Sequence, residues 1–142
     1  MATLQLYDHT AQRFASGANS SADIYKVKLL SAATFDATNT TLAATGGTEV
    51  ANGNGYTTGG QTLAGVAVTT VTTNDAKFDA DDVTWAVSAA SITALAAILY
   101  NDTDTDDPPV AFIDFGGSRT VNSGSSFVLN WNADGIFTWT VT

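Results

Sequence analysis

The chain contains few side chains that could activate a nucleophile. His9 is its single histidine, Glu49 is its single glutamate, and cysteine is absent. A serine hydrolase would have to recruit His9 as its base, yet the sequence has no Gly-x-Ser-x-Gly turn to present the nucleophile. We therefore predict that His9 is a surface residue and that no nucleophilic catalysis takes place.

Paired carboxylates are the second chemistry that the sequence allows, because two of them can cleave a glycosidic bond. Asp81 and Asp82, however, lie between two predicted strands, where aspartates favour turns for backbone reasons. We therefore predict turn residues, and a protein that is not an enzyme. The carboxylates considered for this chemistry are Asp79, Asp81, Asp82 and Asp114.

An acidic segment at residues 101–109 has the spacing with which an EF-hand calcium loop begins. The candidate ligands are Asp102, Asp104 and Asp106. The match then fails, because Asp107 occupies the position that needs glycine and Ile113 stands where a bidentate glutamate belongs. We predict a solvated acidic loop, with no metal and no cofactor. A looser calcium site, completed by other aspartates or by a neighbouring chain, stays open as the alternative.

The charge balance excludes several classes of partner. Lysine and arginine number 5 against 14 acidic residues, which gives a net charge of −9, and only 13% of the residues are charged. No basic cluster could neutralise a phosphate backbone or an anionic membrane, so we expect neither nucleic acid nor membrane as a partner. The longest apolar run, residues 92–100, is shorter than the ~20 residues of a membrane helix. The N-terminus lacks a Sec-type signal, and we expect synthesis in a cytoplasm.

The hydrophobic pattern predicts short strands separated by turns of glycine, asparagine and aspartate. Residues 24–30 alternate, with Tyr25, Val27 and Leu29 on one face and two lysines on the other. We predict strands at 3–7, 24–30, 61–73, 77–80, 83–87, 110–115, 126–131 and 135–141, with 110–115 ended by Gly116 and Gly117 and the last two strands paired as a hairpin. A helical turn is expected near residues 39–44.

Residues 88–100 are ambiguous between a helix and a strand. Their alanine and leucine content suits a helix, whereas Ile92, Ile98 and Tyr100 fall on one face of a strand. We favour a strand buried on both faces, because both alternating sets are apolar. The whole pattern predicts an all-β chain with at most one short helix. Residues 1–142 would form a single domain of the β-sandwich or jelly-roll type.

Aromatic side chains offer a further possibility, because exposed rings can stack on sugars. Trp85, Trp131 and Trp139 all lie in predicted strands with apolar neighbours, so a core position is favoured for each over a sugar platform. Tyr56 lies in the glycine-rich loop at residues 52–60, and we expect it to be exposed for contact with a partner.

Five segments of the chain together resemble a group of small virion proteins encoded by tailed bacteriophages and prophages. They are residues 53–63 (GNGYTTGGQTL), 78–85 (FDADDVTW), 92–102, 110–116 (VAFIDFG) and 127–137, with Trp131 and the run Asp134-Gly135-Ile136 in the last. The resemblance spans roughly two-thirds of the chain. It implies a β-sandwich-like structural protein of the phage particle, without enzymatic activity or cofactor.

The resemblance is compatible with two positions in the particle. The favoured one is a decoration or cement protein that binds the major capsid protein or other virion proteins, as a homo-oligomer on the particle surface. The alternative is a receptor- or carbohydrate-binding module of a tail or fibre. Residues 1–15 are expected to form an arm that reaches a neighbouring subunit. The residues expected to contact partners are Leu4, Leu6, Tyr7, Phe14 and Tyr56.

Overall fold

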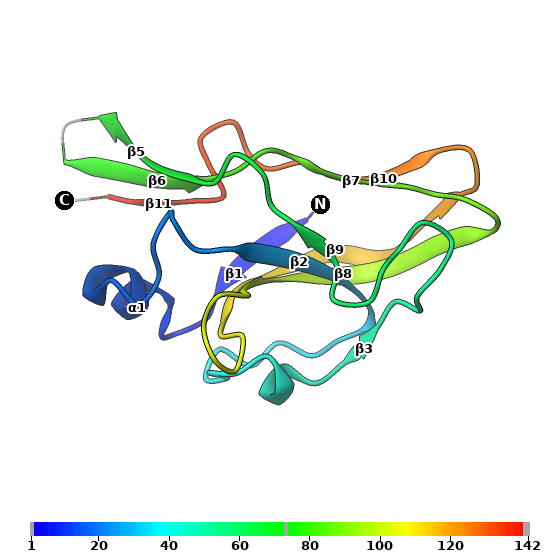
Figure 1. Cartoon of the computed structure of the whole chain (residues 1–142), viewed down its shortest axis with the longest axis horizontal. Coiled ribbons are helices and arrows are strands. Elements are labelled where there is room, and N and C mark those ends of the chain that lie inside the picture. Colours follow the sequence, from blue (N-terminus) through cyan, green and yellow to red (C-terminus); the bar gives the residue numbers. More distant parts are fainter. Residues whose placement is uncertain (1, 73, 141–142) are drawn as a thin grey trace.

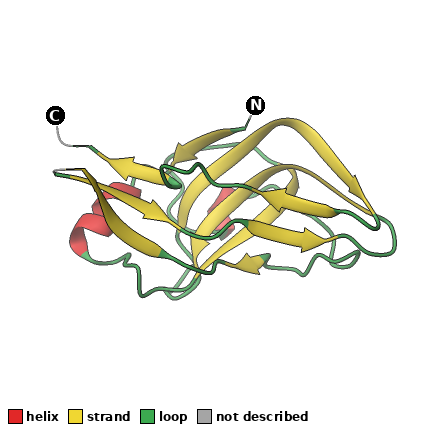
Figure 2. Cartoon of the chain, turned by 90° about the horizontal axis from the view of Figure 1, so that it is seen from above, coloured by secondary structure: helices red, strands yellow, loops and turns green. Residues whose placement is uncertain are grey.

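Two layers of antiparallel strands make up the molecule, in a computed structural model that describes residues 2–72 and 74–140 (Figures 1 and 2). The lower layer in Figure 1 is a six-stranded sheet in the order β1-β9-β8-β2-β3, with β4 also paired to β2. The upper layer consists of two small sheets, β10-β7 and β11-β6-β5. The predicted all-β, sandwich-like fold is confirmed.

The elements follow one another along the chain with short connections. The strands are β1 Thr3–Leu6, β2 Tyr25–Ala32, β3 Thr48–Glu49, β4 Gln61–Thr62, β5 Ala67–Thr72, β6 Asp75–Asp79, β7 Val83–Ala86, β8 Ser91–Asn101, β9 Pro109–Asn122, β10 Ser126–Leu129 and β11 Phe137–Trp139. The α-helix α1 covers Thr10–Ser16, and the 3-10 turn η1 covers Ala43–Thr45. The predicted turn near residues 39–44 corresponds to η1, whereas α1 was not predicted.

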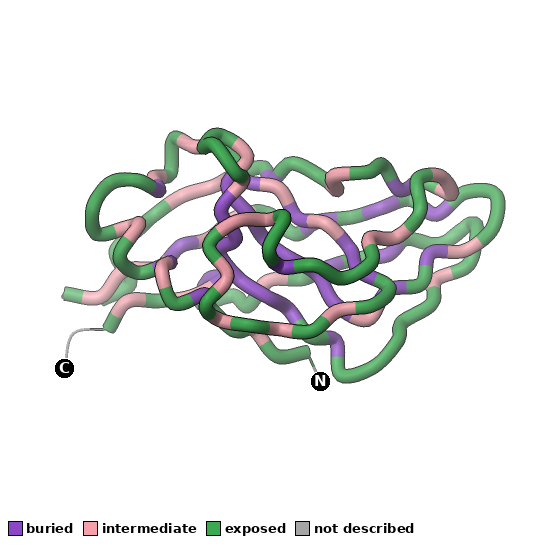
Figure 3. The backbone as a smooth tube through the Cα atoms, turned by 90° about the horizontal axis from the view of Figure 1, so that it is seen from below, coloured by how far each residue is buried: buried purple, intermediate pink, exposed green. Residues whose placement is uncertain are grey.

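The large sheet is buried on both of its faces, which gives the molecule two cores. The main core lies between the layers and includes Val27, Leu29 and Leu99. The second core lies on the opposite face, where the segment containing Phe35 and Leu42 covers Ile98. Buried stretches therefore run along the central strands, whereas exposed ones lie at the turns and along outer strands such as β5 (Figure 3). Apolar side chains on both faces explain why residues 91–101 form a strand, as predicted.

An irregularity in β9 changes which side chains of β8 face the main core. Ala94 pairs with Arg119 and Ala96 pairs with Asp114, so residues 115–118 of β9 stand opposite the single residue Leu95. Ile92 and Ala94 face the main core before this point, and Ala97 and Leu99 face it afterwards. The irregularity thus marks the point at which the side chains of β8 that face the main core change from one alternating set to the other.

The sequence analysis predicted that Gly116 and Gly117 end the strand, and this prediction is wrong. Gly116 and Gly117 have φ values of +74° and +137°, which glycine adopts without strain, and β9 continues to Asn122. The Gly116 N–H donates to the Asp114 carboxylate at 2.8 Å, and the Arg119 guanidinium donates to the Phe115 carbonyl at 3.0 Å. These bonds satisfy backbone groups that would otherwise have lost their strand partners.

The predicted C-terminal hairpin is wrong. A turn does form at residues 132–135, where the Gly135 N–H donates to the Asn132 carbonyl at 2.8 Å. The flanking strands then separate, because β10 pairs with β7 and β11 pairs with β6. Turn residues fix a local reversal, but side-chain packing on distant strands decides the pairing. Residue 141 of the predicted last strand lies outside the described residues.

The long strand predicted at residues 61–73 is divided between the two layers. β4 pairs with β2 in the large sheet, and β5 pairs with β6 in the upper layer. The crossing occurs at residues 63–66, where Leu63 is buried and Gly65 has a φ of +65°. A break in strand direction of this kind is possible at glycine, whose lack of a Cβ permits positive φ. Residue 73 lies outside the described residues.

Candidate functional site

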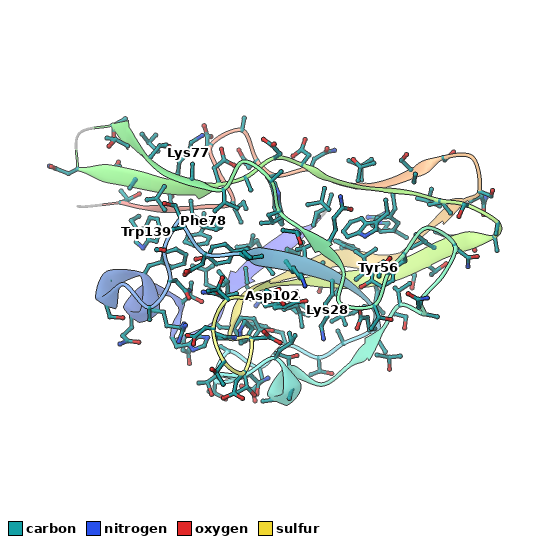
Figure 4. All side chains as sticks on the ribbon, viewed as in Figure 1. Lys28, Tyr56, Lys77, Phe78, Asp102 and Trp139 are labelled. Atoms are coloured by element: carbon teal, nitrogen blue, oxygen red, sulfur yellow. The ribbon has the colours of Figure 1, made fainter. Side chains whose placement is uncertain are left out.

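The acidic loop at residues 101–109 fastens other elements to the large sheet. Asp102 forms an ion pair with Lys26 of β2 at 2.9 Å, and Asp104 forms one with Arg13 of α1. The hydrogen bond from Arg13 to Asp104 lowers the pKa of that carboxyl below its usual range. Figure 4 shows Asp102 where this loop leaves the large sheet. Two of the three calcium candidates are thus paired with cations.

The third candidate, Asp106, does not complete a metal site with the other two. It has a positive φ of 68°, and its carbonyl accepts the Leu42 N–H at 3.0 Å, which ties the loop to η1. Over residues 2–72 and 74–140, no group of three or more histidine, cysteine or acidic side chains could hold a metal ion. The EF-hand spacing in the sequence therefore corresponds to no cluster of ligands here.

A buried amide network lies beneath the acidic loop, and the sequence analysis did not identify it. Asn101, which is fully buried, donates to Asn19 at 2.9 Å and to Asp23 at 3.1 Å. The Arg13 Nε also donates to the side-chain Oδ1 of Asn19, at 3.1 Å. The Nδ2 of Asn19 is buried and has no hydrogen-bond partner among the described residues. The signal in the sequence was an asparagine that directly follows an apolar strand.

Tyr56 is buried in the main core, so the expectation that it is exposed is wrong. Its side chain is 2% exposed, and its hydroxyl donates to Glu49 at 2.7 Å while accepting the Leu29 N–H at 3.0 Å. Glu49 also accepts the Gly59 N–H at 2.6 Å. Burial raises the pKa of the Tyr56 hydroxyl above its usual range. The glycine-rich loop is therefore closed over the sheet by Tyr56 and Glu49, as the position of Tyr56 in Figure 4 illustrates.

Removing the Tyr56 hydroxyl tests this closure. Tyr56→Phe leaves the Leu29 N–H and one Glu49 oxygen without that partner in a buried setting. We expect the free energy of unfolding to fall by about 2 kcal/mol. Urea denaturation would measure the loss. The control is Tyr25→Phe, since the Tyr25 hydroxyl makes a single bond, to the Ser20 carbonyl at 2.8 Å. Equal losses in the two variants would contradict the fastening role of Tyr56.

Residues 2–15 are folded into the domain, so the expectation of a free arm is wrong for them. β1 pairs with β9 over four residues, and Leu4 packs partly against the main core. Tyr7 is 2% exposed and contacts Phe35 at 5.1 Å between ring centroids. Among the predicted contact residues, Leu6 alone is strongly exposed, at 36%.

Phe14 is held by an aromatic cluster that docks α1 under the upper layer. Its ring lies 5.2 Å from that of Phe78, which is fully buried, and 5.2 Å from that of Trp139. Figure 4 shows Phe78 and Trp139 together near α1. The short helix therefore forms because one aromatic side chain anchors it, rather than because of a repeated apolar pattern. A single anchor of this kind is difficult to identify in a sequence.

The residues considered for catalysis make structural contacts with the backbone or with other side chains. His9 Nε2 lies 2.8 Å from the Pro109 carbonyl oxygen, and it is half-buried at the start of α1. Asp82 accepts the Trp131 N–H at 2.7 Å, and Asp79 forms an ion pair with Lys77 at 3.0 Å. Asp81 and Asp82 lie between β6 and β7, which agrees with the turn interpretation of these two aspartates, whereas Asp79 is the last residue of β6.

The three tryptophans differ in their burial. Trp85 is 4% exposed in the main core, as predicted. Trp131 and Trp139 pack against that core but remain half-exposed. Trp131 lines a shallow, acidic surface pocket together with Asp79, Asp81, Asp82 and Asn132. Its ring N–H donates to the Asp81 carbonyl at 3.1 Å.

Apolar surface is exposed in two grooves beside free strand edges. One lies between α1 and β5 and is lined by Phe14, Asn19, Val68 and Trp139. The other lies on the opposite side, where Phe115, Arg119, Val121, Phe127 and Leu129 surround it next to the edge of β10. Exposed apolar grooves of this type are suited to binding another protein.

Comparison with known proteins adds no assignment, since the chain matches no family model, no curated protein and no solved structure. Within the described part of the chain, no helix is long and apolar enough to cross a membrane.

Proposed function

We propose that this chain is a non-catalytic structural protein that works by surface contact in a multi-copy assembly. The observation that carries this proposal is that its charged and apolar side chains have different structural roles. Charged groups such as Arg13, Asp102 and Glu49 fasten loops to the sandwich. Apolar groups such as Leu6, Val68 and Val128 are exposed on strands, where they are available to a partner.

The assembly that we propose is the particle of a tailed bacteriophage. This step is supported by the resemblance of residues 53–63, 78–85, 92–102, 110–116 and 127–137 to small virion proteins. The chain would be made in the host cytoplasm and would then bind the outside of the head. Its partners would be the major capsid protein or other virion proteins, and it would hold neighbouring capsid subunits together.

A binding experiment tests this role. Purified chain is added to capsids that lack it, unbound chain is removed by sedimentation, and the particles are imaged by cryo-electron microscopy. We expect saturable binding, with added density between capsomers of the head. Absence of binding would contradict the cement role, and density confined to the tail would favour the second candidate below.

The second candidate is a receptor- or carbohydrate-binding module of a tail or fibre. The half-exposed Trp131 beside Asp79, Asp81 and Asp82 favours it, because sugars stack on aromatic rings and hydrogen-bond to carboxylates. A glycan array, probed with and without calcium, distinguishes the two candidates. Specific glycan binding that Trp131→Ala abolishes would support the module, and absence of any signal would exclude it.

A further inference from the structure

β5 is an edge strand that projects into solvent. It lies at the end of the sheet order β11-β6-β5, so one of its edges has no partner strand among the described residues. Residues 68–72 are all exposed, with Val68 at 42% and Val71 at 45%. Figure 1 shows β5 and β6 at the end of the molecule, away from the large sheet. The backbone groups on this edge are available for pairing.

An apolar row crosses this small sheet and ends at the free edge. Phe78 pairs with Phe137 on one side and with Val68 on the other, so the three side chains lie in one row. Phe78 is fully buried, Phe137 is half-buried, and Val68 is exposed. A strand added at β5 would continue this row and remove Val68 from water, which is favourable for an apolar side chain.

The usual protection of an edge strand is missing from most of β5. Such strands commonly carry a lysine, a proline or a bulge that discourages pairing. The sequence from Gln61 to Asn74 contains no charged residue and no proline, and β5 is rich in valine and threonine. A register shift occurs between Thr70 and Thr72, at the turn end of the strand. The stretch from Ala67 to Thr70 is regular and free to pair.

A second copy of this chain fits this edge better than a charged partner does. The chain has a net charge of −9, so most copy-to-copy contacts bring like charges together. Uncharged β5 avoids this repulsion along its edge. The adjacent strand β6 has a formal charge of only −1, from Asp75, Lys77 and Asp79, and the last two form an ion pair. An antiparallel strand can also pair with its own copy around a twofold axis, so one surface serves both partners.

We propose that β5 pairs with β5 of a second copy, which joins the two three-stranded sheets into one continuous six-stranded sheet. The contact goes beyond the proposed function, and it rests on that function only in that a multi-copy assembly is where the pairing would be used. Its main contacts would be backbone hydrogen bonds along residues 67–70, flanked by Val68 from each copy.

Cross-linking tests the pairing directly, because the chain has no cysteine of its own. Single-cysteine variants Thr69→Cys and Thr70→Cys are oxidised at several protein concentrations, with Ile24→Cys as the control. We expect a covalent dimer from at least one of the two β5 variants. The control cysteine should give no specific dimer, because Ile24 precedes β2 and belongs to no edge strand, although it is at least as exposed as Val68, at 52% against 42%.

Sedimentation velocity supplies the second measurement. The wild-type chain should show a reversible dimer as its concentration rises towards about 1 mM, and Val68→Lys should lower the association constant by about tenfold or more. Ile24→Lys is the matched control and should leave the constant unchanged, because Ile24 is exposed but lies outside the edge strands. Monomers at every concentration without cross-linking would overturn the pairing, and equal effects of the two lysine variants would overturn its assignment to β5.

The free chain is used in both measurements, so their outcome is separate from that of capsid binding. A chain that dimerises through β5 but does not bind capsids would retain the pairing and lose the proposed function. A chain that binds capsids but never dimerises would retain the function and lose the pairing.

Discussion

Raising the pH above about 10 is expected to unfold this protein over a narrow range, because its tyrosines are all buried. The chain has 4 tyrosines, and each is at most 3% exposed. Burial is the first cause of a raised pKa in every one, and it raises the pKa of Tyr7 to about 12. The pKa values of Tyr25, Tyr56 and Tyr100 are raised further.

The sign of the effect follows from proton linkage. Below the unfolded pKa of about 10, both states hold the phenolic proton and the full stability is present. Between that pH and the folded pKa values, the unfolded chain releases protons that the folded chain retains, so stability falls as pH rises. Each tyrosine contributes up to about 1.4 kcal/mol per pH unit, and the four together up to about 5 kcal/mol per pH unit.

Urea denaturation at a series of pH values measures this slope, and tyrosinate absorbance follows ionisation. We expect ionisation and loss of tertiary structure to occur together, in one cooperative step. Tyr25→Phe should reduce the slope by about a quarter, because it removes one of the four groups. Tyrosines that ionise near pH 10 in a chain that stays folded would contradict the burial of these hydroxyls.

The strands that could be predicted are those whose own residues determine their environment. β2 places Tyr25, Val27 and Leu29 in the main core, as its alternation indicated, and all three are fully buried. β8 is apolar in both alternating sets and lies in the middle of the doubly covered sheet. Local pattern and burial agree in these strands, so the sequence was sufficient to identify them.

Strand partners could not be predicted, because pairing depends on segments far away in the chain. β10 and β11 are separated by a turn typical of a hairpin, yet their partners are β7 and β6. The same limit explains Tyr56, which lies among glycine, asparagine and threonine and so appeared exposed. Its burial depends on Glu49 and on the Leu29 backbone, which are contributed by β3 and β2.

The burial of most of the predicted contact residues could not be foreseen, for a related reason. Leu4, Tyr7 and Phe14 have no regular spacing, which suggested an arm without core positions. In the structure they lie in a strand, a turn and a helix. Leu4 and Phe14 pack against the main core, and Tyr7 lies in the second core. Leu6 on β1 and Val68 on β5 remain exposed, and the second of these was not singled out by its sequence context. The contact surfaces proposed for this protein lie at strand edges, which can be identified only when the sheet order is known.

Replacing Gly60 by alanine is expected to be the most damaging single methyl addition in the glycine-rich loop. A Cβ at this position would lie 1.9 Å from the Val27 carbonyl oxygen and 2.7 Å from the Lys28 Cα, both of which are backbone atoms of β2. The φ of Gly60 is also +82°, which strains any other residue. The loop can relieve the overlap only by moving away from the central sheet, so we expect a loss of about 4 kcal/mol in the free energy of unfolding.

The neighbouring glycine supplies a matched control for this prediction. Gly59 has a similar φ of +91°, but the nearest atom to its added Cβ is the Tyr100 hydroxyl at 3.7 Å, an ordinary contact. Gly59→Ala should therefore cost only the backbone strain, about 1 kcal/mol. Urea denaturation of both variants separates strain, which they share, from the close approach to β2, which is present at Gly60 alone. Losses of similar size would show that the loop does not rest on β2 at Val27, and the closure by Tyr56 and Glu49 would then need a different geometry.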